Sequence, residues 1–140
     1  MHAIWRTLPV DLVIQHIMPF VYQPQAKRML RDIRSFYEDF SLIDECYIHD
    51  YNHYMLLTDI LGFFTLLEHS HYVETGVEKI LRRHMKYADC DISVINKAMY
   101  SMYYKNLENE KSLVQKVRFL WGLMLPVERA RFINKFLLEY

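Results

Sequence analysis

The sequence predicts an all-α fold, a compact bundle of about six to seven helices in a single domain over residues 1–140. Apolar residues recur at the helical spacing along most of the chain, and the alternation typical of strands persists nowhere. The chain is 52% hydrophobic and 15% aromatic, with only three Gly and four Pro. This composition is the opposite of a disordered chain. A chain of this length can also bury a core without disulfides or metals.

A first helix is expected to open at Thr7, Leu8 and Pro9 and to kink or end at Pro19. A second is expected over residues 25–40. Leu12, Ile17 and Phe20 on the first can pack against Leu30, Ile33 and Phe36 on the second, which predicts a helical hairpin within residues 8–40. The second helix is expected to bury a set of apolar residues: Met29, Leu30, Ile33, Phe36, Tyr37 and Phe40.

Ser41 and Asp44 resemble the start of another helix, which runs to about His69 as one helix or as two with a break near Asp50–Asn52. Its second half is apolar almost all round, which predicts a central helix. The remaining helices are expected at about 73–88, 91–105, 109–124 and 126–139, with Asp91 as an N-cap and Pro126 in a first turn. In the last helix we expect Ala130, Ile133, Phe136 and Leu137 to face inward, and Glu128, Arg129, Arg131 and Lys135 to face water.

The formal charge is zero, but residues 1–70 carry a balance of −4 and residues 71–140 one of +4. Nucleic-acid binders usually carry a basic excess, so nucleic acid is not expected as the main partner. Arg82, Arg83 and Lys86 form a basic cluster late in a predicted helix. They either complement the helix dipole or contact phosphate. Weak nucleic-acid binding through the basic C-terminal half is therefore kept as an alternative.

No Gly-x-Ser-x-Gly elbow and no Gly-rich phosphate loop are present, so we predict neither an enzyme nor a cofactor. His49 and His53 are four residues apart, a spacing used by zinc sites on helices, with Glu45 as a further candidate. Three candidates do not make a site, and we predict no metal, with ordinary surface or interface histidines as the main interpretation.

Cys46 and Cys90 make no disulfide framework. The N-terminus lacks a signal-peptide pattern, and the most apolar stretch, Met55–Leu67, is too short to span a membrane. We therefore expect an intracellular protein without a membrane partner.

One predicted helix is crowded with aromatic and Met side chains that cover more than one face. Such residues are typical of cores and also of protein interfaces. Both interpretations stay open, and a homo-oligomer contact is predicted for five residues: Met99, Tyr100, Met102, Tyr103 and Tyr104.

The segment over residues 8–21 resembles the opening of an F-box, with matches at Leu8, Pro9, Asp11, Leu12, Ile17 and Met18. The later Val…Trp part of the F-box pattern is not present. The resemblance implies that Leu8, Pro9, Leu12, Ile17 and Met18 bind an adaptor of a cullin-type ubiquitin ligase.

Over residues 8–36, Leu-Pro-x-Asp-Leu, Tyr-x-Pro-Gln and Leu-x-Asp-Ile-x-x-Phe together resemble short uncharacterised proteins of nucleocytoplasmic large DNA viruses, including the marseillevirus-like group. The resemblance implies a viral protein in the host cytoplasm or nucleus, or packaged in the virion. The leading hypothesis is a non-enzymatic accessory or virion-associated protein that binds itself, as a homodimer, or other viral and host proteins. The alternative is an F-box-like adaptor that recruits a host target for ubiquitination.

Overall fold

The structure is a computed structural model that describes residues 9–17, 26–66 and 76–139, and it is all-α. The chain divides into two compact units, Met1–Leu30 and Arg31–Tyr140. In the first unit, α1 (Val10–Leu12) runs directly into a π-helical turn, η2 (Val13–Ile17). The predicted hairpin over residues 8–40 includes residues outside the described ranges, so it stays a prediction.

Helix α3 (Lys27–Asp50) does not restart at Ser41, where the sequence suggested a new helix. Phe40, Ile43 and Tyr47 are all buried and keep the helical spacing across that point, so one continuous stripe faces the core. The alternative break near residues 50–52 is confirmed, because α4 (His53–Leu66) begins after it. The side chain of Asn52 accepts a hydrogen bond from the Met55 N–H at 2.9 Å and caps α4.

Four residues that were expected on the buried side of this helix are exposed: Met29, Leu30, Ile33 and Tyr37. The buried line of α3 instead follows Phe36, Phe40 and Ile43. Ile33 and Tyr37 lie to one side of that line on the helical wheel, so the expected apolar face was too wide.

The later helices are α5 (Gly76–Leu81), α6 (Ile92–Tyr104), α7 (Glu110–Leu123) and α8 (Pro126–Ile133), followed by the π-helical turn η3 (Asn134–Leu138). Helix α5 is shorter than predicted because residues 82–89 form turns. The Arg82 guanidinium donates to the carbonyls of Ala88 and Cys90, which satisfies those groups outside a helix.

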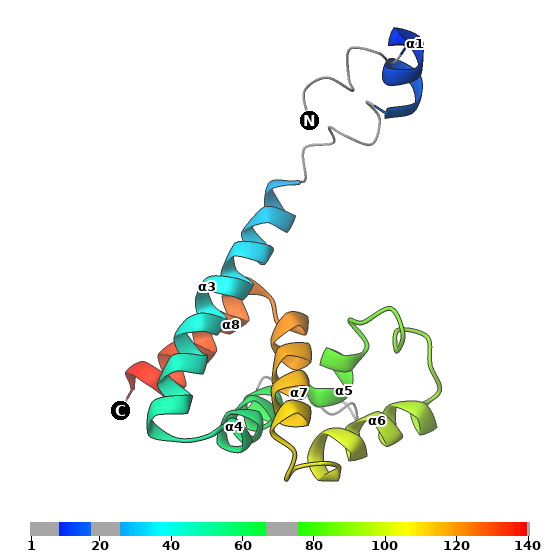
Figure 1. Cartoon of the computed structure of the whole chain (residues 1–140). Coiled ribbons are helices and arrows are strands. Elements are labelled where there is room, and N and C mark those ends of the chain that lie inside the picture. Colours follow the sequence, from blue (N-terminus) through cyan, green and yellow to red (C-terminus); the bar gives the residue numbers. More distant parts are fainter. Residues whose placement is uncertain (1–8, 18–25, 67–75, 140) are drawn as a thin grey trace. The chain divides into compact units, whose positions relative to one another are not determined.

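Helix α4 packs most extensively against α7. In Figure 1, α3 and α8 run beside each other at one end of the second unit, and α5 and α6 lie at the other end. Leu56, Ile60 and Phe64 of α4 are fully buried, as expected for a central helix. They belong to the same buried cluster as Trp121 and Phe132. Burying each such side chain stabilises the fold by about 1.5–3 kcal/mol relative to exposure.

The end of α6 is closed by a lysine from α7. The Lys116 ammonium donates to the carbonyl of Ser101 at 2.8 Å and to that of Lys105. A cation is favoured there because the last carbonyls of a helix carry the negative end of its dipole. Burial lowers the pKa of Lys116, and nearby Glu108 partly opposes that shift. Asn106 then turns the chain with a φ of 52°, a conformation that Asn tolerates.

The charged face predicted for α8 is partly wrong, since Glu128 and Arg129 are buried while Ala130 is exposed. Both charges have partners from distant parts of the chain, which the spacing along α8 does not indicate. Among the described residues, no helix combines the length and the apolar character needed to cross a membrane.

Candidate interaction surface

Two adjacent tyrosines stand out from the surface of α6. Tyr100 is 56% exposed and Tyr104 is 66% exposed, and their ring centroids are 5.1 Å apart. The other predicted interface residues on this helix, Met99, Met102 and Tyr103, are partly buried and pack against the core. The structure thus divides the set between the two interpretations that the sequence left open: three residues contact the core and two face outward.

Beside these tyrosines lies a cavity of about 410 Å³ between α4 and the end of α6. We call it the α4–α6 groove. Leu57, Leu61 and Met102 line it, with Leu107 just beyond α6. Tyr104 borders the same space, so one of the exposed rings belongs to the groove. An apolar hollow beside an exposed aromatic pair is an arrangement that protein interfaces use.

The two threonine hydroxyls in the groove have partners within their own helix. The Thr58 hydroxyl donates to the Tyr54 carbonyl at 2.9 Å, and the Thr65 hydroxyl donates to the Gly62 carbonyl at 2.6 Å. Burial raises the pKa of Tyr103, with a smaller contribution from Tyr104, so its hydroxyl stays neutral. The groove therefore offers an uncharged surface suited to apolar side chains.

Gly62 forms part of this surface, in the middle of α4. A Cβ placed on Gly62 would meet no atom of the described chain within 4 Å. Glycine inside a helix costs about 0.5–1 kcal/mol relative to alanine. Within the described chain, no neighbouring atom explains why a glycine rather than an alanine stands at this position. A glycine does keep the helix surface flat, which allows close approach from outside.

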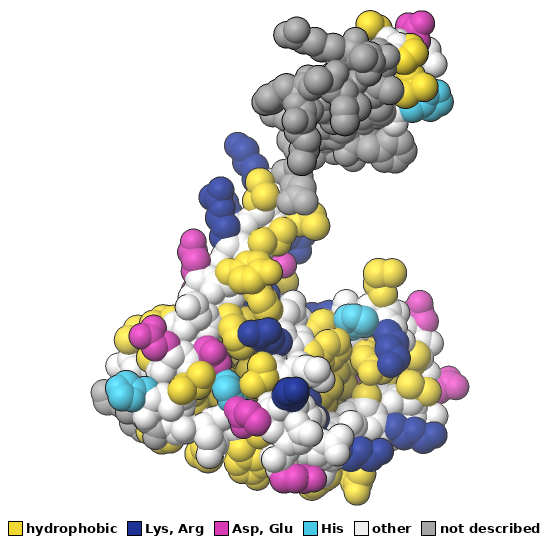
Figure 2. Space-filling model, viewed as in Figure 1, with side chains coloured by type: hydrophobic (Ala, Val, Ile, Leu, Met, Phe, Trp, Pro, Cys, Tyr) yellow, Lys and Arg dark blue, Asp and Glu magenta, His cyan; other side chains and the backbone are white. Residues whose placement is uncertain are grey.

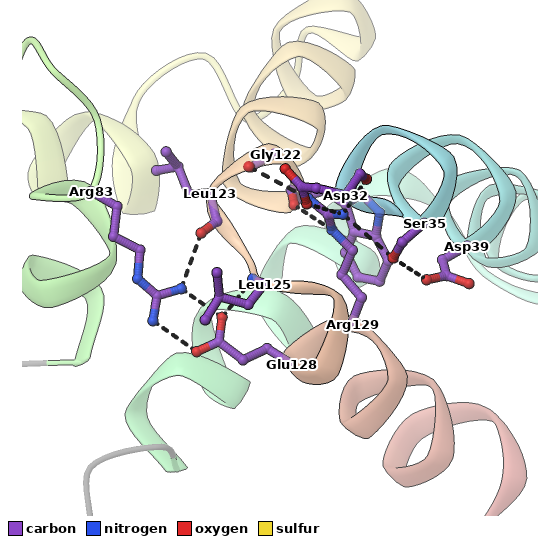
Figure 3. Close-up of polar contacts among 10 residues, drawn as sticks. Asp32, Ser35, Asp39, Arg83, Gly122, Leu123, Leu125, Glu128 and Arg129 are labelled. Atoms are coloured by element: carbon purple, nitrogen blue, oxygen red, sulfur yellow. Dashed lines mark hydrogen bonds and ion pairs between the residues drawn. The ribbon is translucent and has the colours of Figure 1, made fainter. Parts of the chain in front are cut away.

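The basic cluster has partners inside the fold. The Arg83 guanidinium binds both carboxylate oxygens of Glu128, at 2.5 and 2.7 Å, and donates to the Leu123 carbonyl (Figure 3). Arg82 pairs with Glu78 at 3.0 Å. Lys86 is exposed, with its ammonium 5.3 Å from the centroid of the Tyr87 ring.

These contacts account for both arginines without a phosphate ligand. On the face that Figure 2 shows, Lys and Arg side chains lie among Asp and Glu rather than in one basic patch. The arrangement gives no support to the phosphate role predicted for Arg82 and Arg83.

Arg129, next to Glu128, is only 1% exposed and joins three helices. It donates to the Trp121 carbonyl at the end of α7 and to the backbone and side chain of Asp32 in α3. Its guanidinium carbon also lies 5.5 Å from the centroid of the Phe36 ring. Figure 3 shows Arg129 between α3 and α7. Its role is structural, since every polar contact it makes is internal.

His49 and His53 lie on different helices, in α3 and α4, so they do not share a helix face as the spacing suggested. His49 is exposed. His53 is buried, with Nε2 2.7 Å from Asp44 and Nδ1 in contact with Glu110. Both ring nitrogens are therefore occupied by carboxylates, and no cluster of metal ligands occurs within residues 9–17, 26–66 and 76–139.

Burial acts to lower the pKa of His53, but the hydrogen bonds and charges of its two carboxylate partners raise it above its usual value. The protonated ring can donate to both partners at once. It therefore ties α4 to α3 and α7.

The F-box-like segment lies in the first unit. Pro9 is exposed and Leu12 is 42% exposed. Leu8 and Met18 lie outside the described residues, and so does the side chain of Ile17.

Sequence patterns missed the groove floor, because its residues come from α4 and α6, which are distant in the chain. The one local signal was Gly62, a glycine within an otherwise apolar helix. Comparison of the chain with protein-family models, curated proteins and solved structures gave no match in any of the three.

Proposed function

We propose that this protein is a non-enzymatic binding protein and that it forms a homodimer through the α4–α6 groove. The observation that carries the proposal is Gly62, which leaves the floor of an apolar groove flat without an internal reason. His53, Lys116 and Arg129 hold helices together, so the proposal assigns them a structural role. A viral accessory or virion-associated role, in the host cytoplasm or nucleus, is part of the same proposal.

We expect a second copy of the chain to fit the groove, because the exposed Tyr104 ring and the α4–α6 groove lie next to each other. A two-fold contact lets Tyr104 of each copy enter the groove of the other, which makes the interface self-complementary. The formal charge of zero adds no net repulsion between copies.

The test is the mass of the protein in solution, measured by sedimentation over a range of concentrations. We expect Gly62→Glu and Tyr104→Ala to give monomers, because the first fills the groove with charge and the second removes the inserted ring. Gln115→Glu and Tyr37→Ala are matched controls on exposed helix positions outside the groove, and both should remain dimeric. A wild type that stays monomeric at high micromolar concentration would refute the dimer.

The F-box-like adaptor is a second candidate. It is supported by the exposure of Leu12 and by the position of the F-box-like segment in a separate compact unit, Met1–Leu30. An adaptor needs its docking helix accessible. We expect wild-type protein to recover cullin-ligase adaptors from host-cell lysate and a folded Leu12→Asp variant to lose them. Equal recovery by both proteins would rule out this use of Leu12.

A further inference from the structure

A second cavity, of about 270 Å³, lies between the end of α3, helix α4 and η3. Its lining includes three aromatic rings, from Tyr47, Tyr51 and Phe136, together with Met55 and the carboxylate of Asp59. Pockets that hold drug-sized ligands usually start at about 300 Å³, so this cavity suits a small head group or the end of a side chain.

The rings come from two separate parts of the chain. Tyr47 and Tyr51 have centroids 5.7 Å apart with planes tilted by 46°, and the Tyr51 N–H donates to the Tyr47 carbonyl, which holds them one turn apart. Phe136 is held by stacking on Phe132, with centroids 4.6 Å apart. The aromatic lining is therefore anchored by contacts within the fold.

Asp59 supplies the charge. Its Oδ2 accepts a hydrogen bond of 2.5 Å from the Tyr47 hydroxyl. None of the ion pairs among the described residues involves this carboxylate. A negative charge beside aromatic rings is complementary to a cation, because the faces of such rings are themselves electron-rich.

We propose that this cavity binds a small methylated ammonium group. A bare ammonium has three N–H donors, and each of them needs an acceptor when the group is buried. A methylated ammonium has fewer donors or none, and its methyl groups suit aromatic rings and the Met55 side chain. The site does not depend on the dimer, since the exposed tyrosines of α6 take no part in it.

The experiment is a titration of the full chain, followed by calorimetry and by NMR of the cavity resonances. The probes are tetramethylammonium, choline, a peptide with trimethyllysine, the same peptide with unmodified lysine, and 3,3-dimethylbutanol. The last probe has nearly the shape of choline but no charge. We expect saturable binding of at least one methylated cation, and binding of the neutral analogue at least about tenfold weaker.

Two variants locate the site. Asp59→Asn keeps an acceptor for the Tyr47 hydroxyl and should weaken cation binding about tenfold. Tyr51→Ala removes a mostly exposed ring and should weaken it similarly, whereas Tyr37→Ala should leave it unchanged. Tighter binding of the trimethyllysine peptide than of choline would assign the ligand to a protein side chain, and the reverse to a free amine. Equal binding of the neutral analogue, or no saturable binding of any methylated cation, would overturn the proposal.

Discussion

Replacing Arg129 by alanine removes a side chain that bonds α8 to both α7 and α3. The guanidinium donates to the Trp121 carbonyl at 3.1 Å and to the Asp32 carboxylate at 2.9 Å, and it is almost completely buried. Removing one partner of a buried ion pair costs about 3–5 kcal/mol. The Asp32 side chain is 48% exposed, so water can solvate the carboxylate that is left. We therefore expect a loss at the low end, about 3 kcal/mol.

A loss of this size is a large part of the 5–15 kcal/mol that stabilises a typical domain. Urea unfolding followed by circular dichroism measures it directly, and the midpoint should fall by about 1.5 M for a typical slope. Arg129→Lys keeps the charge but cannot span the same acceptors, so we expect an intermediate loss of about 2 kcal/mol. Arg131→Ala is the matched control, because this arginine lies on the same helix and is exposed. It should change stability by less than about 0.5 kcal/mol. Equal midpoints for Arg129→Ala and Arg131→Ala would refute the structural role.

Three further variants test the other buried charges. The pKa of His53 is raised, so its contribution to stability is complete below the unfolded value of 6.5 and is lost as pH rises through the folded value. Unfolding midpoints of the wild type should fall above about pH 6.5, and His53→Gln should remove this slope. Burial acts to raise the pKa of Glu128, but Arg83 and the Leu125 N–H hold it below 4.5. That stability is present above about pH 4.5 and lost on acidification, and a Glu128→Gln variant with an unchanged acid slope would contradict the assignment. Lys116→Met should cost about 1–3 kcal/mol and speed amide exchange at the end of α6, whereas Lys111→Ala on the exposed face should do neither. If the amides at the end of α6 exchange at the same rate in Lys116→Met as in the wild type, the contact of Lys116 with those carbonyls does not stabilise the helix end.

Helix content followed from local patterns, as three segments illustrate. The second half of the 41–69 segment is apolar nearly all round, and the corresponding α4 is the buried centre of the second unit. Pro126 opens α8. The helix is interrupted at Tyr51 and Asn52, which was one of the two expected alternatives. These features depend on residues a few positions apart, which is the range over which helix spacing and capping act.

Errors arose where contacts with distant residues, or a break in the helix, changed what a local pattern implies. Ser41 and Asp44 resemble a helix start, yet the core contacts of Phe40 and Ile43 carry the helix through. His49 and His53 have the spacing of a metal pair, but a helix break separates them. Their four-residue spacing has meaning only if both lie on one helix.

The sequence by itself determined that the chain is helical, roughly where most helices lie, and which helix is central, because these properties come from apolar spacing. Only the tertiary structure decided that Glu128 and Arg129 are buried, since their partners Arg83 and Asp32 lie far away along the chain. It likewise decided which α6 tyrosines face outward and which residues line the α4–α6 groove. The physical reason is that burial of a charge depends on its compensation in space, and the shape of a groove depends on how two helices meet.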